Sequence, residues 1–252
     1  MIAILSDVHA NLEALTAVYQ DIAQRGVQRI FFLGDIVGYG PNPEEVLDFI
    51  QHFEFSLLGN HDEACLHGPP KDFNAVATKA AWWTRRQICP DEMAAAFLRP
   101  AQYQKRQERW AYLLNLKPVR TMGDMMFVHD TPASPGSWRY VRNRVEANAG
   151  FAAHPSVRAF FFGHTHQPGV WTESEYKVAE PGKKFDFSQR VMINVGSVGQ
   201  PRDKDPRACY VLLEPDGLRF FRVPYDYAKT QKKIRDCAEL DPVLADRLSQ
   251  GT

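Results

Sequence analysis

Residue types that commonly bind metal ions follow five short apolar runs in this sequence. In chain order the runs and the polar residues after them are AILS with Asp7 and His9, FFLG with Asp35, SLLG with Asn60, His61 and Asp62, MMFV with His129, and FFFG with His164 and His166. Apolar runs of this length predict buried strands, and open α/β sheets bind ligands beyond the carboxyl ends of their strands. We therefore expect five neighbouring strands to bring these side chains to one crevice. The remaining histidines, His52, His67 and His154, do not follow such runs.

The ligand types indicate a class of metal. Imidazole nitrogens combined with carboxylate and carboxamide oxygens, and no thiolate, suit divalent Mn, Fe, Ni or Zn. Two such cations held by only two carboxylates, Asp7 and Asp35, would leave a net charge of about +1 even with a shared hydroxide. A centre of this charge attracts a phosphate ester, although the chain as a whole has a net charge of zero.

Each motif also has an explanation that needs no metal. An Asp-x-His sequence after a strand often forms a turn or a cap, Gly-Asn-His-Asp can form a polar β-turn, and Gly-His-Thr-His can be a histidine pair without a function. Their shared position after five apolar runs is hard to explain unless they bind metal. The glycine-rich stretch Gly34–Gly40 lacks the Lys-Ser/Thr pair of a P-loop and the spacing of a dinucleotide fingerprint. We expect its glycines to allow a turn that directs Asp35 inward.

Composition and charge argue against several classes of protein. The chain has 252 residues, of which 44% are apolar and 24% charged, as in ordinary globular proteins. Neutral charge and the lack of a basic stripe with interleaved aromatics argue against a nucleic-acid ligand. No stretch approaches the roughly 20 apolar residues of a membrane helix, and the N-terminus lacks the basic region of a secretory signal. The four cysteines form no CxxC pair, so we expect reduced thiols in a cytoplasmic protein.

The first part of the chain alternates between predicted strands and helices, which is typical of βαβ units. The expected strands are Met1–Ser6, Arg29–Leu33 and Phe55–Leu58, and the expected helices are Asn11–Gln24 and Glu44–Phe53. The segment Asp72–Leu116 has helical spacing and predicts a helical insertion. Its aromatics, Trp82, Trp83, Tyr103 and Trp110, either pack in the core or form a lid over a leaving-group pocket.

Strands resume after the insertion. A hairpin is expected at Val119–Met122 and Met125–Val128, then a helix at Val141–Ala152, then strands at Ala159–Phe162, Gly169–Thr172, Val191–Val195, Ala208–Glu214 and Leu218–Val223. A helical tail is expected over Tyr227–Leu248, to about residue 249. An α/β opening followed by antiparallel strands indicates two packed sheets with helices outside. We expect residues 1–252 to form a single domain.

In these motifs the sequence resembles the calcineurin-like metallophosphoesterase superfamily. The matching segments are Asp7-Val8-His9, Gly34-Asp35, Gly59-Asn60-His61-Asp62, His129, Gly163-His164-Thr165-His166 and Ile193–Arg202. The stretch Asp35–Pro43 is similar to a small prokaryotic branch of phosphodiesterases and phosphatases. The resemblance implies a four-layer α/β/β/α sandwich of two mixed sheets flanked by helices.

The resemblance also implies roles for individual residues. Asp7, His9 and His166 would hold one metal, Asn60, His129 and His164 the other, and Asp35 would bridge the two. His61 would contact the phosphate and donate a proton, Asp62 would orient His61, and Asn11 would support a ligand. Tyr39 and Arg202 are candidate substrate contacts. The implied reaction is hydrolysis of a small phosphate ester by a hydroxide shared between two divalent metals.

The identity of the ester stays open at this point. A phosphodiester is favoured, and the alternatives on the same site are a phosphomonoester or a dinucleoside polyphosphate. A non-catalytic scaffold of the same fold is a further alternative, although such proteins tend to lose the histidine that matches His61. Two positions depart from the family pattern: Asp130 stands where glycine is usual, and Val195 where this branch often has proline. Neither change removes a ligand, and the oligomeric state is not indicated.

Overall fold

Two mixed six-stranded sheets form the centre of the protein in a computed structural model that describes residues 1–252. The first sheet contains β1 (Ile2–Leu5), β2 (Arg29–Phe32), β3 (Phe55–Ser56), β9 (Lys184–Phe185), β11 (Ala208–Glu214) and β12 (Gly217–Val223). The second contains β4 (Val119–Met122), β5 (Met125–Val128), β6 (Ala159–Phe162), β7 (Gly169–Trp171), β8 (Tyr176–Val178) and β10 (Val191–Asn194). Their spatial orders are β3-β2-β1-β11-β12-β9 and β4-β5-β6-β10-β7-β8.

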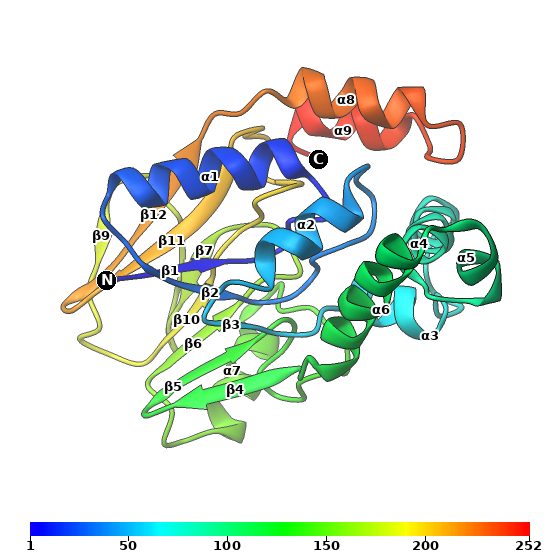
Figure 1. The fold of residues 1–252 in the computed structure, drawn as a ribbon. Coiled ribbons are helices and arrows are strands. Elements are labelled where there is room, and N and C mark those ends of the chain that lie inside the picture. Colours follow the sequence, from blue (N-terminus) through cyan, green and yellow to red (C-terminus); the bar gives the residue numbers. More distant parts are fainter.

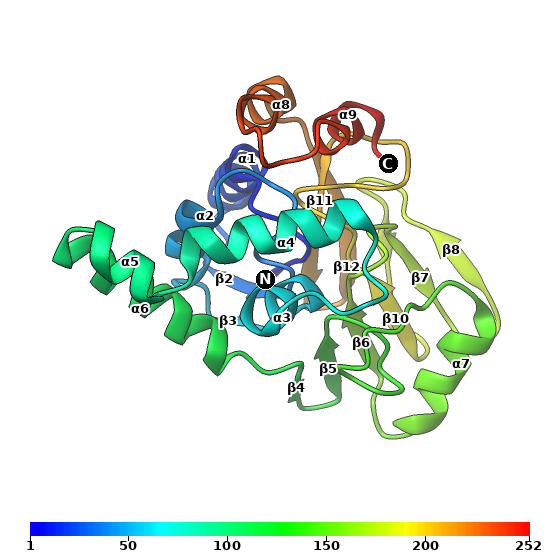
Figure 2. The same cartoon turned by 90° about the vertical axis from the view of Figure 1, so that its right-hand side faces the viewer.

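Helices cover the outer faces of both sheets and extend beyond them (Figures 1 and 2). They are α1 (Leu12–Gln24), α2 (Pro43–Ile50), α3 (Asn60–His67), α4 (Ala75–Ile88), α5 (Glu92–Phe97), α6 (Pro100–Asn115), α7 (Arg144–Ala153), α8 (Tyr227–Asp236) and α9 (Val243–Gln250). Helices α1 and α2 pack on the first sheet and α7 on the second. No helix of the structure is both long enough and apolar enough to cross a membrane.

Alternating side chains along each strand divide the core into layers. In β1, Ile4 packs between the two sheets, whereas Ala3 and Leu5 face the helices. In β6, Phe161 lies between the sheets while Phe160 and Phe162 pack toward α7. Strands buried on both faces have continuous apolar sequences, because every side chain of the run reaches a core. The four-layer α/β/β/α sandwich expected from the sequence is therefore confirmed.

Several element boundaries differ from the expected ones. Strands β8 and β9 were not predicted, because each has only two or three residues and none of them is buried. Helix α3 was missed as well, since it begins directly at Asn60 in a motif that was interpreted as a strand end. Helix α7 begins at Arg144 rather than Val141, because the side chain of Asn143 caps it by accepting a hydrogen bond from the Glu146 N–H.

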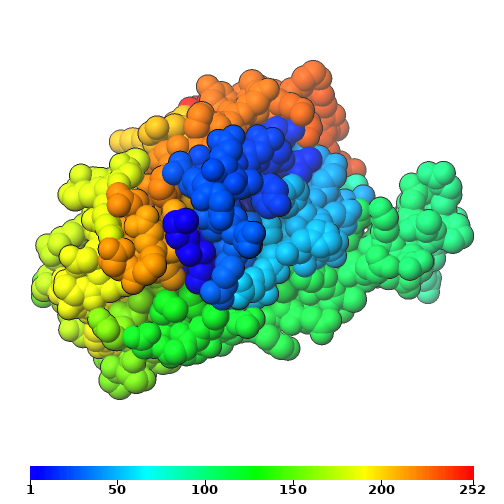
Figure 3. All heavy atoms as spheres, turned by 60° about the vertical axis from the view of Figure 1, so that its left-hand side comes forward, coloured from blue at the N-terminus to red at the C-terminus, as the bar shows by residue number.

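Part of the expected insertion forms a projecting arm, whereas α4 packs against α8 and α9. Figure 3 shows the residues near 90–110 as a protrusion from the rest of the surface. Near its base, Arg109 on α6 pairs with Asp48 on α2 at 2.7 Å. The C-terminal tail is helical but divided, with α8 and α9 lying side by side and a break that includes Asp241 and Pro242 (Figure 1).

Candidate metal centre

The loops after strands of both sheets are joined by backbone hydrogen bonds. In the first sheet, the N–H of Asp7 donates to the carbonyl of Gly34 and the N–H of His9 to that of Asp35, both at 3.0 Å. In the second sheet, the N–H of Gly163 donates to the carbonyl of His129, also at 3.0 Å. The expectation that five strands meet at one crevice needs one correction. Strands β1, β2 and β3 belong to one sheet and β5 and β6 to the other, so the crevice lies where the carboxyl ends of two packed sheets face each other.

Five of the seven predicted ligands have an unusual backbone conformation. Asp7, His9, Asp35, His164 and His166 all have φ between 48° and 64°. Only nine non-glycine residues in the protein have positive φ. Each such residue costs on the order of 1–3 kcal/mol and persists only where the surroundings enforce it. Strain concentrated in this way indicates that the loops are built to aim particular side chains.

Two glycines, Gly59 and Gly163, allow their loops to lie in contact with the carboxylates of Asp35 and Asp7. A Cβ on Gly59 would lie 2.2 Å from both the backbone nitrogen and Oδ1 of Asp35. A Cβ on Gly163 would lie 2.3 Å from Oδ2 of Asp7. Both distances are far inside van der Waals contact, so only glycine fits at these positions. Glycine therefore precedes Asn60 and His164 in the sequence motifs because any side chain at these positions would clash with a carboxylate of the centre.

The carboxylates of Asp7 and Asp35 each accept a backbone hydrogen bond through one oxygen and direct the other oxygen toward the histidines of the centre. Oδ2 of Asp7 accepts from the N–H of His164 at 3.1 Å, and Oδ1 of Asp35 accepts from the N–H of His61 at 2.8 Å. The other oxygens face imidazoles. Oδ1 of Asp7 lies 3.1 Å from Nε2 of His166, and Oδ2 of Asp35 lies 3.3 Å from Nε2 of His129 and 3.5 Å from Nε2 of His9.

Backbone carbonyls fix which ring nitrogen of each histidine carries its proton. Nδ1 lies 3.2 Å from the Val37 carbonyl in His9, 2.9 Å from the Leu33 carbonyl in His129 and 2.5 Å from the Gln200 carbonyl in His166. In His164 it is Nε2 that lies 3.0 Å from the Trp138 carbonyl. A carbonyl only accepts, so these nitrogens donate, and the opposite nitrogen of each ring presents a lone pair.

These lone pairs converge with the free carboxylate oxygens, and this convergence tests whether a metal fits. Nε2 of His9 lies 3.2 Å from Nε2 of His166, although both nitrogens are acceptors. Oδ1 of Asp7 is buried without a hydrogen-bond partner. The potential ligand atoms fall into two groups, Asp7, His9, Asp35 and His166 in one and Asp35, His129 and His164 in the other. Buried acceptors that face only each other need a cation between them, so the residues fit two metals that share Asp35.

Asn60 lies beside the second group. Its Oδ1 lies 3.1 Å from Nε2 of His129, the nitrogen that presents a lone pair. The electrostatics of this group favour positive charge. Burial lowers the pKa of His129, but the Asp35 carboxylate outweighs burial and raises the pKa to about 10, so without a cation in the centre a proton binds at Nε2, where the lone pair would otherwise face a metal. Burial and the neighbouring His129 lower the pKa of His164 to about 3.

His61 faces the cleft beside the centre and is not one of the converging ligands. Its ring packs against Tyr39 with the two planes tilted by 49° and the centroids 4.3 Å apart, and its Nδ1 is buried without a partner. Burial lowers the pKa of His61 to about 4 while no anion is bound beside the ring. Tyr39 also packs against His9, with centroids 4.8 Å apart. Arg202 lies nearby, its guanidinium carbon 5.9 Å from the centre of the Tyr39 ring.

Two supporting residues act differently from what the resemblance implies. The carboxylate of Asp62 does not hydrogen-bond to the His61 ring. It accepts from the backbone N–H groups of Asp35 at 2.9 Å, Gly59 at 3.0 Å and Val37 at 3.1 Å, and so joins the two loops that carry Asp35 and Asn60. Burial, reinforced by Asp35, raises the pKa of Asp62 to about 7.

Asn11 bonds to none of the seven predicted ligands. Its Nδ2 donates to the carbonyl of Gly199 at 2.9 Å, and its Oδ1 accepts from the N–H of Ala14 and the hydroxyl of Thr230. The residue therefore caps α1 and joins it to α8 and to the loop at Gly199. The N–H of Gly199 in turn donates to the carbonyl of Asp7 at 2.9 Å. Support of the centre by Asn11 is thus indirect.

The structure gives Asp130 a definite contact. Its carboxylate accepts from the N–H groups of Gly136 and Trp138. The carbonyl of Trp138 is the acceptor that orients His164. Asp130 is therefore two hydrogen bonds away from a predicted ligand. Nothing in the sequence pointed to Trp138, because this residue contributes a backbone carbonyl and every residue type has one. The other carbonyls that orient histidines could not be predicted for the same reason.

Val195 is the other position that departs from the family pattern, where proline is frequent. Its N–H donates to the Phe162 carbonyl at 2.8 Å, and a proline at this position would lose that hydrogen bond.

A cleft of about 870 Å³ opens beside the centre. Asn60, His61 and His164 form its inner end, and its walls include the aromatic residues Tyr39, Phe73, Trp138 and Tyr140 together with Arg139 and Arg142.

The aromatic residues of the expected insertion do not form a lid over this cleft. None of Trp82, Trp83, Tyr103 and Trp110 lines this cleft. Trp83 is buried in a core cluster with α8 and α9, and the hydroxyl of Tyr103 donates to the carbonyl of Pro90.

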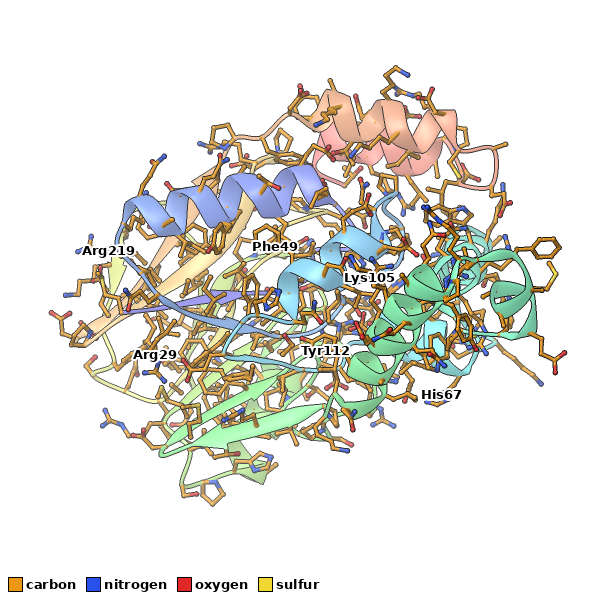
Figure 4. All side chains as sticks on the ribbon, viewed as in Figure 1. Arg29, Phe49, His67, Lys105, Tyr112 and Arg219 are labelled. Carbon is orange, nitrogen blue, oxygen red and sulfur yellow. The ribbon has the colours of Figure 1, made fainter.

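The three histidines that do not follow strands lie outside the centre. His67 is exposed at the end of α3, where Figure 4 labels it. His52 is also exposed, and His154 lies 2.8 Å from the carbonyl of Pro132 through its Nε2. The position of a histidine after an apolar strand therefore separates the residues of the centre from the rest.

Comparison with known proteins gives the same assignment as the geometry. A family model described as the calcineurin-like phosphoesterase superfamily domain matches residues 1–217. An uncharacterised protein of Methanocaldococcus jannaschii is 35% identical over 240 residues, which are 93% of this chain and 91% of that protein. The crystal structure of a metallophosphoesterase from Sphaerobacter thermophilus is 38% identical with a TM-score of 0.82, over 100% of this chain and 98% of that one. A hypothetical protein from Pyrococcus horikoshii, 17% identical, shares the fold with a TM-score of 0.74 over 100% and 99% of the two chains. The chain therefore belongs to the calcineurin-like phosphoesterase superfamily.

Proposed function

We propose that this protein hydrolyses phosphodiesters with the help of two divalent metal ions. The observation that carries the proposal is the convergence of lone pairs and carboxylate oxygens in two groups that share Asp35. A non-catalytic scaffold would have no use for strained loops that place buried acceptors against one another. The complete set of predicted ligands, together with His61 at the cleft, favours an enzyme over a scaffold.

The proposed ligands divide between the two metals. Asp7, His9 and His166 hold one ion, Asn60, His129 and His164 hold the other, and Asp35 contributes to both. Nitrogen and oxygen donors without sulfur favour Mn, Fe, Ni or Zn. When bound, two such ions activate a water molecule at neutral pH and stabilise negative charge on phosphate oxygens.

His61 is proposed to bind the phosphate, whose negative charge raises the pKa of the ring, and then to protonate the leaving oxygen. Its ring lines the cleft next to Asn60 and His164, and its buried Nδ1 has no partner within the protein. A general acid of this kind contributes typically 10²–10⁴-fold to the rate when the leaving group is poor. Tyr39 holds the ring in place by packing against it, and Arg202 adds positive charge nearby.

A diester is favoured over a monoester by the charge and by the walls of the cleft. A centre with a net charge near +1 suits the single charge of a diester. The aromatic walls, Tyr39, Phe73, Trp138 and Tyr140, suit an apolar or aromatic leaving group. The protein is also proposed to act in the cytoplasm, and its four free cysteines support a reducing compartment.

The test of this proposal is hydrolysis of bis(4-nitrophenyl) phosphate before and after removal of metal. We expect extensively chelated protein to be inactive and added Mn²⁺ or another transition ion to restore activity. Elemental analysis of the active sample should give about two ions per chain. Full activity in a verified metal-free sample would contradict the proposal.

A further inference from the structure

The cleft has one rigid wall made by the segment Thr131–Arg142. The carboxylate of Asp130 accepts from two N–H groups of this segment, and the N–H of Thr131 donates to the carbonyl of Arg139 at 3.1 Å. The carbonyl of Trp138 accepts from His164. The wall is therefore bonded to itself and to the metal centre, so the groups that it presents to the cleft are held in advance of ligand binding.

A stack of planar groups runs from the metal centre along this wall. The Tyr140 ring lies parallel to the His164 ring, with centroids 4.0 Å apart and planes within 10°. The guanidinium carbon of Arg142 lies 3.8 Å from the centroid of the same Tyr140 ring. Because His164 occupies one face of Tyr140 at contact distance, the guanidinium must cover the other. Arg142 is thus separated from a predicted metal ligand by the thickness of one aromatic ring.

Two positive charges on this wall have no acidic partner. Arg139 and Arg142 both line the cleft and both are exposed. Neither of these arginines forms an ion pair. Most other arginines of the protein either form an ion pair or donate to a backbone carbonyl. Glu146 also lines the cleft, but its carboxylate accepts from the backbone N–H groups of Arg142 and Asn143 and caps α7. Stacking leaves the edge of a guanidinium free, and this edge binds a phosphate through two parallel hydrogen bonds.

We infer that Arg139 and Arg142 form a second anion subsite, and that the preferred substrates are phosphodiesters that carry a further phosphate beyond the scissile one. The inference rests on the proposed function and specifies its substrate class. The scissile phosphate binds at Asn60, His61 and His164, and the second phosphate binds to the two arginines. The part of the substrate that links the two phosphates lies between them, past the edge of the Tyr140 ring, because both faces of that ring are already covered. The ligand class is therefore a phosphodiester with a second, separated anionic group, of which a nucleoside with phosphates at both 5′ and 3′ positions is one example.

The test compares two substrates that differ by one phosphate. Thymidine 5′-(4-nitrophenyl phosphate) is assayed with a free 3′-hydroxyl and with a 3′-phosphate, at the same pH and Mn²⁺ concentration. For the wild-type protein we expect kcat/KM to be roughly tenfold higher with the 3′-phosphate, which corresponds to one charge-assisted phosphate contact. Raising the ionic strength should reduce this preference, because the contact is between exposed charges.

Arginine variants test whether the two arginines cause the preference for the substrate with the 3′-phosphate. The Arg139→Gln/Arg142→Gln double variant keeps side-chain length and should lower the preference to about twofold or less. Arg144→Gln is the matched control, since Arg144 is exposed next to this wall, does not line the cleft and donates to the Ser174 carbonyl. It should keep the full preference. Equal rates for the two substrates with the wild type, or an undiminished preference in the double variant, would overturn the inference. Failure to cleave either substrate would instead contradict the proposed function.

Discussion

Asp35 offers the sharpest test of the paired metal centre, because it belongs to both groups of potential ligands. Its Oδ2 is nearly equidistant from His129, at 3.3 Å, and from His9, at 3.5 Å. Its Oδ1 accepts from the N–H of His61. Asp35→Asn keeps the size of the side chain and an oxygen for His61, but it removes the negative charge from the oxygen between the two groups. We expect both metals to be lost together.

The expected magnitude follows from the ligand count. Changing a group that merely orients a ligand costs 10–100-fold in metal affinity, so loss of a charged ligand should cost on the order of 100-fold or more at each site. A hundredfold change is about 2.7 kcal/mol per ion. At a free metal concentration tenfold above the wild-type Kd, occupancy would fall from about 0.9 to about 0.1 at both sites.

The assay is elemental analysis after equilibrium dialysis against one fixed free Mn²⁺ concentration. His9→Ala is the matched control, because His9 belongs to one group only, and it should keep about one of two ions. Circular dichroism on each variant excludes loss of the fold as the cause. Asp35→Asn with the same metal content as the wild type, or with loss of only one ion, would refute the assignment of Asp35 as a shared ligand.

The remaining predictions concern chemistry and support. His61→Gln should keep its metal content and lower kcat strongly with an alkyl leaving group, but only weakly with nitrophenolate, which needs no proton. If kcat with the alkyl leaving group is the same as for the wild type, His61 is not the acid. Asp130→Ala frees the segment that orients His164, so elemental analysis should show a 10–100-fold weaker affinity for one metal, and unchanged affinity would contradict this role. For matched aryl esters, kcat/KM should favour the diester, and a tenfold preference for the monoester, about 1.4 kcal/mol, would indicate a phosphatase instead.

The sequence indicated the candidate residues of the centre because their chemical types and positions are local properties. A strand with both faces buried gives a continuous apolar run, and the polar residue that follows it stands at the strand end whatever the rest of the chain does. Asp7, Asp35 and His164 are all recognisable in this way. Residue types also restrict the class of metal, since nitrogen and oxygen donors without thiolates are visible in the sequence itself.

Predictions about where a side chain points were less successful. The resemblance placed Asp62 against His61, whereas its carboxylate joins the loops of Asp35 and Asn60. Helical spacing identified Trp83 as an aromatic of the insertion, but it could not say whether the ring faces a cleft or the core, where it is buried. Strands β8 and β9 have no buried face, so they have no hydrophobic pattern from which to predict them.

Only the tertiary structure decided how the ligands meet. Asp7 and His166 are 159 positions apart by number, and their approach to 3.1 Å depends on two sheets that pack with their carboxyl ends together. Backbone carbonyls from distant loops select the histidine nitrogen that faces the centre, and a carbonyl has no signature in the sequence because every residue carries one. The wall of the cleft formed by Thr131–Arg142, where Tyr140 and Arg142 stack beyond His164, likewise exists only after the fold brings the loops after β5 and β6 together. Residue type sets which atoms can bind a metal, and packing sets which of those atoms share one.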